Sequence, residues 1–241
     1  MCGIFAIFSS SLPASELRKE LIKCSSELRH RGPDWSGYIV VERDPPARPL
    51  NHGIAHERLA IMDPESGSQP LVSSDGNVIA AANGEVYNYK ELYDCLARPY
   101  APATGSDCEV LLPLWDELGA SPDLPDRLRG MFSVIMYDKS TDAYFVFRDH
   151  IGKTPLYIGW GNDGSVYVAS EMKSLVGACA KFQNFPPGHF YTNKGPQAGK
   201  FVRWYKPNWA PEMKPGLPPP TQPFQEVRVT RLCVTKCSVV V

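Results

Sequence analysis

The chain has 241 residues, 43% of them hydrophobic, and a formal net charge of -1 at pH 7. This length allows one large domain or two small ones with a substantial core. The near-neutral charge gives no electrostatic indication of binding to nucleic acid or to an anionic membrane, so we expect neither partner. No apolar run approaches the roughly 20 residues that span a membrane.

The first half of the chain combines short apolar runs with one helical segment. Leu17, Leu21, Cys24 and Leu28 recur at helical spacing and predict a helix over residues 15–30, which Gly32 and Pro33 end. Residues 29–37 are dense in charge and glycine and are predicted to form a loop. Strands are expected over residues 3–8, 38–41, 53–62 and 78–82.

The second half predicts two helices followed by a meander of strands. The helices are expected over residues 88–97 and 107–118, and Asp107 is the expected N-cap of the second. Strands over residues 131–137, 143–147, 156–160 and 166–169, a short helix over 171–176 and a hairpin over 188–204 follow. Since short turns join neighbouring strands, this order indicates antiparallel sheets covered by helices rather than a parallel, doubly wound sheet.

The composition changes after residue 206. Residues 211–223 are rich in proline, and residues 226–241 contain β-branched residues without an evident partner strand. We expect residues 1–206 to form one domain and residues 207–241 to form a linker and a tail.

The seven cysteines form no Cys-x-x-Cys pair, and Cys233 and Cys237 have no nearby histidine to complete a zinc site. An odd number with this spacing is typical of reduced thiols rather than of a disulfide framework. We therefore expect a cytoplasmic protein without a metal site in these residues.

Cys2 directly follows the initiator methionine. Removal of Met1, which a small second residue favours, gives Cys2 a free α-amine beside its thiol. The amine has a reference pKa of about 7.7–8.0 and can take the proton from sulfur, which is a strong nucleophile. The alternatives are a cysteine without a catalytic role and a signal peptide, although no Lys or Arg precedes the apolar run.

Other polar groups interrupt apolar strand patterns. Asn83 and Gly84 follow a predicted strand and are suitable donors to an oxyanion, although Asn-Gly is also a common turn. Arg58 requires an anion, either a substrate carboxylate or an acid such as Glu57. Asp107 can bind an ammonium group or cap its helix.

These residues belong to a series of short motifs. In chain order the series includes Met1-Cys2-Gly3-Ile4, Arg31-Gly32-Pro33-Asp34-Trp35, His56-Glu57-Arg58-Leu59, Gly67-Ser68-Gln69-Pro70, Asn83-Gly84-Glu85, Gly105-Ser106-Asp107, Arg148-Asp149-His150 and Ala169-Ser170-Glu171-Met172-Lys173. The chain from Cys2 to about Trp204 resembles the N-terminal glutaminase domain of asparagine synthetase, a class II glutamine amidotransferase of the N-terminal-nucleophile hydrolase type.

This resemblance implies a fold and a reaction. The fold is α+β, a four-layer αββα sandwich of two antiparallel sheets flanked by helices. The reaction is hydrolysis of glutamine to glutamate and ammonia without a cofactor, through a thioester on Cys2, with Asn83 and Gly84 as the oxyanion hole. In asparagine synthetase the ammonia serves asparagine formation from aspartate and ATP.

The resemblance also implies how glutamine binds. Arg58 takes its α-carboxylate and Asp107 its α-ammonium group, while Glu85 and the backbone at Ile61 and Met62 line the same pocket. Arg31 lies close to the site by the same analogy but has no assigned role.

The sequence departs from asparagine synthetases in one respect. It contains no Ser-Gly-Gly-Leu-Asp-Ser-type loop, which marks their ATP-binding part, so ATP and Mg are expected only through a synthetase domain or chain. A truncated or spliced product, a subunit that supplies a separate synthetase, and a regulator that binds glutamine without turnover all remain open. So does an amidotransferase serving another acceptor, and the sequence indicates no oligomeric state.

Overall fold

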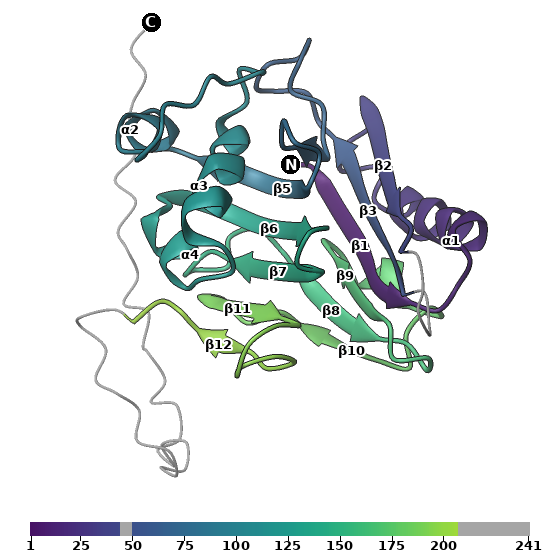
Figure 1. Cartoon of the computed structure of the whole chain (residues 1–241). Helices are drawn as coiled ribbons and strands as arrows, with labels where there is room; N and C mark the ends of the chain where they lie inside the picture. Colours follow the sequence, from purple (N-terminus) through teal and green to yellow (C-terminus); the bar gives the residue numbers. More distant parts are fainter. Residues whose placement is uncertain (44–49, 207–241) are drawn as a thin grey trace, which may run out of the picture. The chain divides into compact units, whose positions relative to one another are not determined.

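A computed structural model describes residues 1–43 and 50–206. Two antiparallel six-stranded sheets pack face to face, and helices cover their outer faces (Figure 1). The first sheet contains, in spatial order, β10 (Lys181–Asn184), β8 (Tyr157–Trp160), β9 (Val166–Ala169), β1 (Gly3–Ser10), β3 (Asn51–Arg58) and β2 (Trp35–Val41). The second contains β12 (Val202–Arg203), β11 (His189–Thr192), β7 (Ala143–Arg148), β6 (Gly130–Asp138), β5 (Val78–Val86) and β4 (Leu71–Val72).

The helices form the outer two layers. Helix α1 (Ala14–Ser26) covers the first sheet, and the second sheet carries α2 (Tyr89–Asp94), α3 (Leu111–Leu118) and α4 (Asp123–Arg127). Two 3₁₀ turns, Asp107–Val110 and Met172–Leu175, complete the described elements. The expected α+β sandwich of two antiparallel sheets is confirmed.

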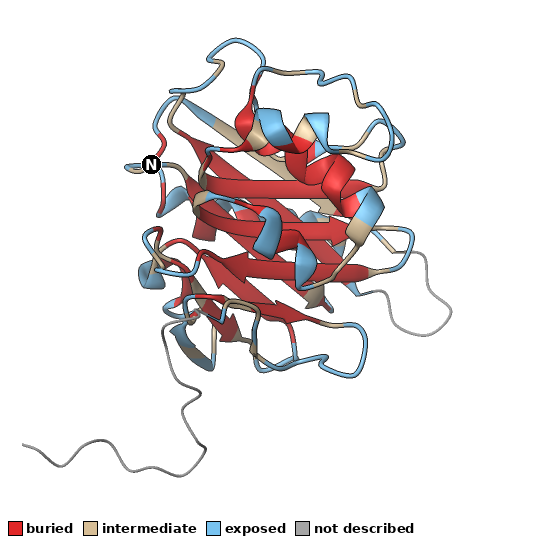
Figure 2. Ribbon diagram, turned by 90° about the vertical axis from the view of Figure 1, so that its left-hand side faces the viewer, coloured by how far each residue is buried: buried red, intermediate tan, exposed pale blue. Residues whose placement is uncertain are grey.

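The central strands are buried on both faces, which explains their continuous apolar sequences. On β1, Phe5 and Ile7 face α1, whereas Ile4 and Phe8 face the second sheet. Figure 2 shows the central strands buried almost throughout and the helices exposed on their outer sides. Because side chains alternate along a strand, every second residue of β1, β3 and β5 points into the space between the sheets.

Helix α1 ends at Ser26, four residues earlier than expected. Beyond it the hydrogen bonds span three residues, from Leu28 N to Ser25 O at 2.8 Å and from Arg31 N to Leu28 O at 2.9 Å. Leu28 still reaches the core below α1. The apolar side of the predicted helix therefore stays buried as far as Leu28, although the backbone is no longer α-helical there.

Several strand boundaries also differ from the sequence prediction. β2 begins at Trp35, inside the predicted loop, β3 ends at Arg58 rather than at residue 62, and β5 continues to Val86 rather than ending at residue 82. Pairing with a neighbour explains all three, since Trp35 pairs with Arg58 and Val86 pairs with Gly130. The short elements β4, β10 and α4 were not predicted.

The N-cap prediction for Asp107 is wrong. The cap is Ser106, whose Oγ accepts a hydrogen bond from Cys108 N at 3.3 Å. The expected helix over residues 107–118 is a 3₁₀ turn followed by α3, and the expected helix over 171–176 is a 3₁₀ turn. The predicted linker and tail, residues 207–241, lie outside the described residues.

Candidate active site

The candidate site lies at one end of the space between the sheets. His56 and Arg58 on β3 follow Ile54 at alternate positions, and Ile54 belongs to the core between the sheets. Asn83 and Glu85 on β5 continue the same inward face from the second sheet, after Ala81. A pocket is formed where these faces meet, and it includes every residue that the sequence predicted for the site, namely Cys2, Arg58, Ile61, Met62, Asn83, Gly84, Glu85 and Asp107.

Cys2 is half-buried at the start of β1. Its Sγ accepts a hydrogen bond from Leu59 N at 3.4 Å and lies 3.7 Å from Leu59 O. Its carbonyl oxygen accepts a hydrogen bond from Arg31 Nε at 2.9 Å, and Arg31 is in turn paired with Glu171 at 2.9 Å. Arg31 therefore anchors the main chain of Cys2, a contact that the sequence did not predict.

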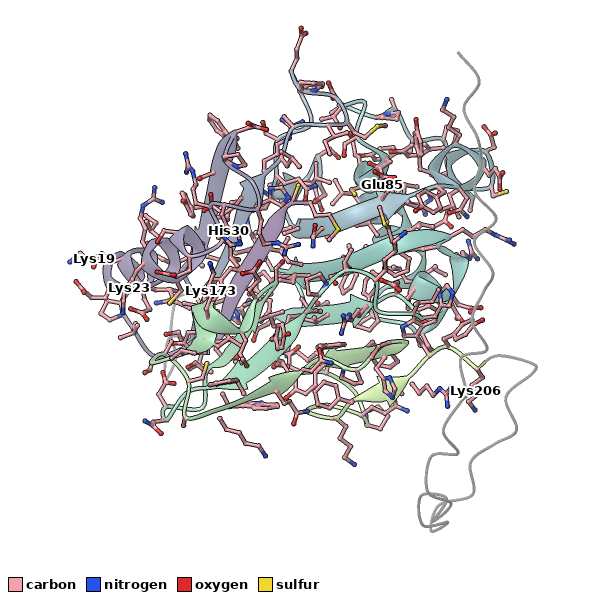
Figure 3. The ribbon with its side chains drawn as sticks, turned by 180° about the vertical axis from the view of Figure 1, so that it is seen from behind. Lys19, Lys23, His30, Glu85, Lys173 and Lys206 are labelled. Atoms are coloured by element: carbon pink, nitrogen blue, oxygen red, sulfur yellow. The ribbon has the colours of Figure 1, made fainter. Side chains whose placement is uncertain are left out.

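The contacts that hold Arg31, and through it Cys2, extend to residues at the protein surface. Glu171 also pairs with His30 at 3.0 Å, and Lys173 Nζ lies 3.3 Å from His30 Nδ1. Figure 3 shows His30 and Lys173 close together beside α1. Hydrogen bonds from His30 and Arg31 lower the pKa of Glu171, against the effect of burial.

Asn83 is fully buried, and both polar atoms of its side chain lack a partner among the described residues. A buried amide without hydrogen bonds is uncommon and is destabilising, so this group has capacity for a ligand. Gly84 has φ 139°, and a Cβ there would lie 1.9 Å from Met131 O, which only glycine avoids. Both residues lie inside β5, so the alternative of an Asn-Gly turn is wrong.

Arg58 is almost fully buried and is held by backbone carbonyl groups. Its Nη1 donates to Pro64 O at 3.3 Å, and its Nη2 donates to Met62 O at 3.0 Å and to Asp63 O. No ion pair of the described chain includes Arg58. Neutral groups thus orient the guanidinium, and its positive charge is available to bind an anion.

The alternative that Glu57 pairs with Arg58 is wrong. The carboxylate of Glu57 points to the outer face of the sheet, where it accepts hydrogen bonds from Ser36 at 2.5 Å and Tyr38 at 3.0 Å and pairs with Arg29 at 3.5 Å. Neighbouring residues of a strand point to opposite faces, so the side chains of Glu57 and Arg58 point away from each other.

Asp107 lies on the opposite side of the pocket from the β3 residues. Its carboxylate accepts a hydrogen bond from Val86 N at 2.6 Å, and burial raises its pKa above the usual range. Glu85 projects from β5 nearby (Figure 3). Ile61 and Met62 are 64% and 42% exposed, so they form the rim rather than the floor.

His56 is a pocket residue to which sequence patterns assigned no role. It is fully buried, its Nε2 lies 3.2 Å from Ala82 O, and burial lowers its pKa to about 4. A carbonyl only accepts, so the neutral ring donates from Nε2, and Nδ1 has no partner in the described chain. The available signal was a histidine two residues before Arg58, and hence on the same face of the strand.

Known proteins resemble the chain in both sequence and fold. A family model for the glutamine amidotransferase domain matches residues 1–191. The chain belongs to this family. It is similar to asparagine synthetase [glutamine-hydrolyzing] 1 of Arabidopsis thaliana, with 44% identity over 218 residues, and to a probable asparagine synthetase [glutamine-hydrolyzing] of Dictyostelium discoideum, with 40% identity over 243 residues.

The chain spans only part of these relatives. The two alignments cover 90% and 96% of the chain but 35% and 41% of the relatives. Among solved structures, a glutamine phosphoribosylpyrophosphate amidotransferase from B. subtilis aligns with a TM-score of 0.64 at 21% identity, covering 85% of this chain and 49% of that one. This likeness shows that the glutamine amidotransferase domain shares its fold with that enzyme.

Two features are absent from the part of the chain that the structure describes. Within residues 1–43 and 50–206, no helix has the length and apolar character needed to cross a membrane. The same residues contain no group of three or more His, Cys, Asp or Glu side chains arranged to hold a metal ion.

Proposed function

We propose that residues 1–206 form a glutaminase domain that hydrolyses glutamine to glutamate and ammonia through a thioester on Cys2. The observation that carries the proposal is the buried amide of Asn83, which lies in the same pocket as the Cys2 thiol and has no hydrogen-bond partner among the described residues. Such an amide is a preorganised donor, because no protein group has to be displaced before it binds an oxyanion.

The first step begins on the processed chain. After removal of Met1, the α-amine of Cys2 takes the thiol proton, and sulfur attacks the side-chain carbonyl carbon of glutamine. The charge that develops on oxygen is stabilised by hydrogen bonds from Asn83 Nδ2 and Gly84 N–H. The carbon–nitrogen bond then breaks, the amine returns its proton to the leaving nitrogen, and ammonia departs.

Water completes the reaction. The α-amine of Cys2 takes a proton from water, whose oxygen attacks the thioester carbonyl, and the same donors stabilise the second oxyanion. The carbon–sulfur bond then breaks, the amine returns the proton to sulfur, and glutamate leaves. Arg58 binds the α-carboxylate and Asp107 binds the α-ammonium group throughout, while Glu85 lines the same pocket, and this holds the side-chain amide close to sulfur.

We propose further that the ammonia serves asparagine formation from aspartate and ATP. This proposal rests on the similarity to asparagine synthetases, of which the chain spans about a third. ATP and Mg are assigned to a synthetase domain or chain and not to the glutaminase pocket. The described cysteines are all free thiols, which supports a cytoplasmic location.

The test is glutamine hydrolysis by the purified chain without ATP or aspartate. Ammonia and glutamate are expected in equal amounts from chain whose mass shows that Met1 is absent, and Cys2→Ala is expected to release neither while retaining its circular dichroism spectrum. Undiminished turnover by Cys2→Ala, or turnover by chain that retains Met1, would refute the mechanism. Unprocessed chain has no free α-amine on Cys2, so it is expected not to turn glutamine over.

A further inference from the structure

The two charged groups proposed to bind glutamine belong to different segments. Arg58 ends β3 in the first sheet, and Asp107 begins the 3₁₀ turn that leads into α3 on the second. Their separation decides whether both ends of one amino acid can bind at once. Contacts between the loop after Arg58 and the loop before Asp107 therefore affect substrate binding, because they influence this separation.

One residue connects the two loops. The carboxylate Oδ2 of Asp63 accepts a hydrogen bond from Gly105 N at 2.7 Å, two residues before Asp107. Its carbonyl oxygen accepts a hydrogen bond from Arg58 Nη2. The carbonyl and carboxylate of the same residue thus contact the Arg58 side and the Asp107 side of the pocket.

The conformation of Asp63 is held by its own loop. Its Oδ1 accepts a hydrogen bond from Ser66 N at 3.2 Å, Ser66 Oγ donates to Oδ2, and its carbonyl also accepts from Gly67 N at 3.0 Å. Asp63 has φ 46°, a left-handed conformation that persists in a non-glycine residue when its surroundings stabilise it. A Cβ on Gly67 would lie 2.8 Å from Arg58 Nη2, so this loop packs directly on the guanidinium.

We infer that Asp63 is a positioning residue that sets the distance between Arg58 and Asp107 and thereby the affinity for glutamine. This inference rests on the proposed function, since it assigns glutamine to the two charges. Asp63 acts through Arg58 and through the Gly105–Asp107 segment. It takes no part in proton transfer or in stabilising the oxyanion, so its loss changes substrate binding and not the chemical step.

The test compares three variants of the full chain with Met1 removed. Asp63→Gly deletes the carboxylate without strain at positive φ, and Asp63→Asn keeps the shape but loses the charge. Asp75→Asn is a matched control, because Asp75 also accepts hydrogen bonds within an exposed loop, from Ser73 Oγ at 2.5 Å and Asn77 N at 3.1 Å, but lies outside the pocket.

The expected result is a split between kinetic parameters. Asp63→Gly raises the KM for glutamine about tenfold with kcat within about twofold, Asp63→Asn has a smaller effect of the same kind, and Asp75→Asn changes neither. In a Cys2→Ala background, calorimetry is expected to show the same tenfold loss of glutamine affinity. Titration of the reactive thiol corrects kcat for misfolded molecules, so a purely structural effect would lower the number of active sites and leave KM unchanged.

The possible outcomes separate this inference from the proposed function. An unchanged KM and affinity in Asp63→Gly, or a loss confined to kcat, overturns the role of Asp63 and leaves the glutaminase intact. Glutamine binding by the parent chain without ammonia release overturns the glutaminase, and the calorimetric series then decides the role of Asp63. No glutamine binding by the parent chain overturns both.

Discussion

Buried polar side chains near the pocket differ in whether they form hydrogen bonds with the rest of the protein. Glu109 is 2% exposed, but its carboxylate accepts hydrogen bonds from Tyr100 Oη and from the backbone of Ala103 and Thr104. Asn83 is equally buried and has no partner in the described chain. Glu109 therefore organises its loop, whereas Asn83 carries an unfavourable desolvation that a bound oxyanion would offset.

Replacing Asn83 with alanine tests this distinction. Asn83→Ala is expected to lower kcat for glutamine about 100- to 1,000-fold, because one oxyanion donor is lost. The free energy of unfolding is expected to fall by less than about 1 kcal/mol, because no protein hydrogen bond is broken. Steady-state kinetics and urea denaturation measure the two effects, and a large loss of stability would mean that Asn83 has a structural partner.

Strand β5 carries Asn83 and Gly84, which are proposed to donate hydrogen bonds to the oxyanion. It pairs with β6 without interruption from Val78 to Val86, and Gly84 lies opposite Phe132. The close approach of Gly84 to Met131 O leaves no room for a side chain. The strand therefore requires glycine for steric reasons as well as for its positive φ.

Gly84→Ala is expected to lower the free energy of unfolding by more than about 2 kcal/mol, because the strand must shift to accommodate a Cβ. Gly76→Ala is the control, since Gly76 has φ 74° and a Cβ there would meet nothing within 4 Å, so only the conformational cost of about 1 kcal/mol applies. Urea denaturation of both variants measures the difference. Equal losses would show that the contact with Met131 is easily relieved.

At the scale of the whole molecule, two buried histidines on β3 connect the sheets. His52 stacks on Tyr137 of β6 with ring centroids 4.4 Å apart, and His56 contacts Ala82 O of β5. Burial lowers the pKa of each to about 4. Folding therefore requires both rings to be neutral, and this links stability to pH.

Acidification is expected to destabilise the fold below about pH 6.5. Each folded-state pKa lies below the unfolded value of 6.5, so the unfolded chain binds more protons between about pH 6.5 and pH 4, and stability is full above this window and falls within it. For His56 alone the loss at pH 5 is about 2 kcal/mol. Urea denaturation between pH 7.5 and pH 5 measures it. His56→Gln is expected to show a shallower decline, and a decline as steep as that of the parent would contradict the assignment.

Truncation tests the domain boundary. Chain ending at Lys206 is expected to fold and to hydrolyse glutamine with the kcat of the full chain, because residues 1–43 and 50–206, the part that the structure describes, already form three hydrophobic clusters and the pocket. Circular dichroism and ammonia release provide the measurements. An insoluble or inactive truncation would place essential contacts beyond residue 206.

Local sequence patterns predicted the strands and helices that bury a regular apolar face. Residues 3–8, 131–137 and 143–147 emerged as strands because a continuous apolar run suffices for burial on both faces. The predicted site residues were identified from the order of motifs along the chain, and the pocket contains all of them. Short elements such as β4 and β10 were missed because two to four residues carry too little periodicity.

The sequence did not predict which segments far apart in the chain contact one another. The extension of β5 through Asn83 depends on its register with β6, and the partners of Arg58 are carbonyl groups of a loop whose path local sequence does not specify. The link from Asp63 to Gly105 joins residues 42 positions apart. Such contacts follow from packing of distant segments, so only the tertiary structure separates Arg58, whose charge is proposed to bind substrate, from Glu57, whose charge is paired on the outer face of the sheet.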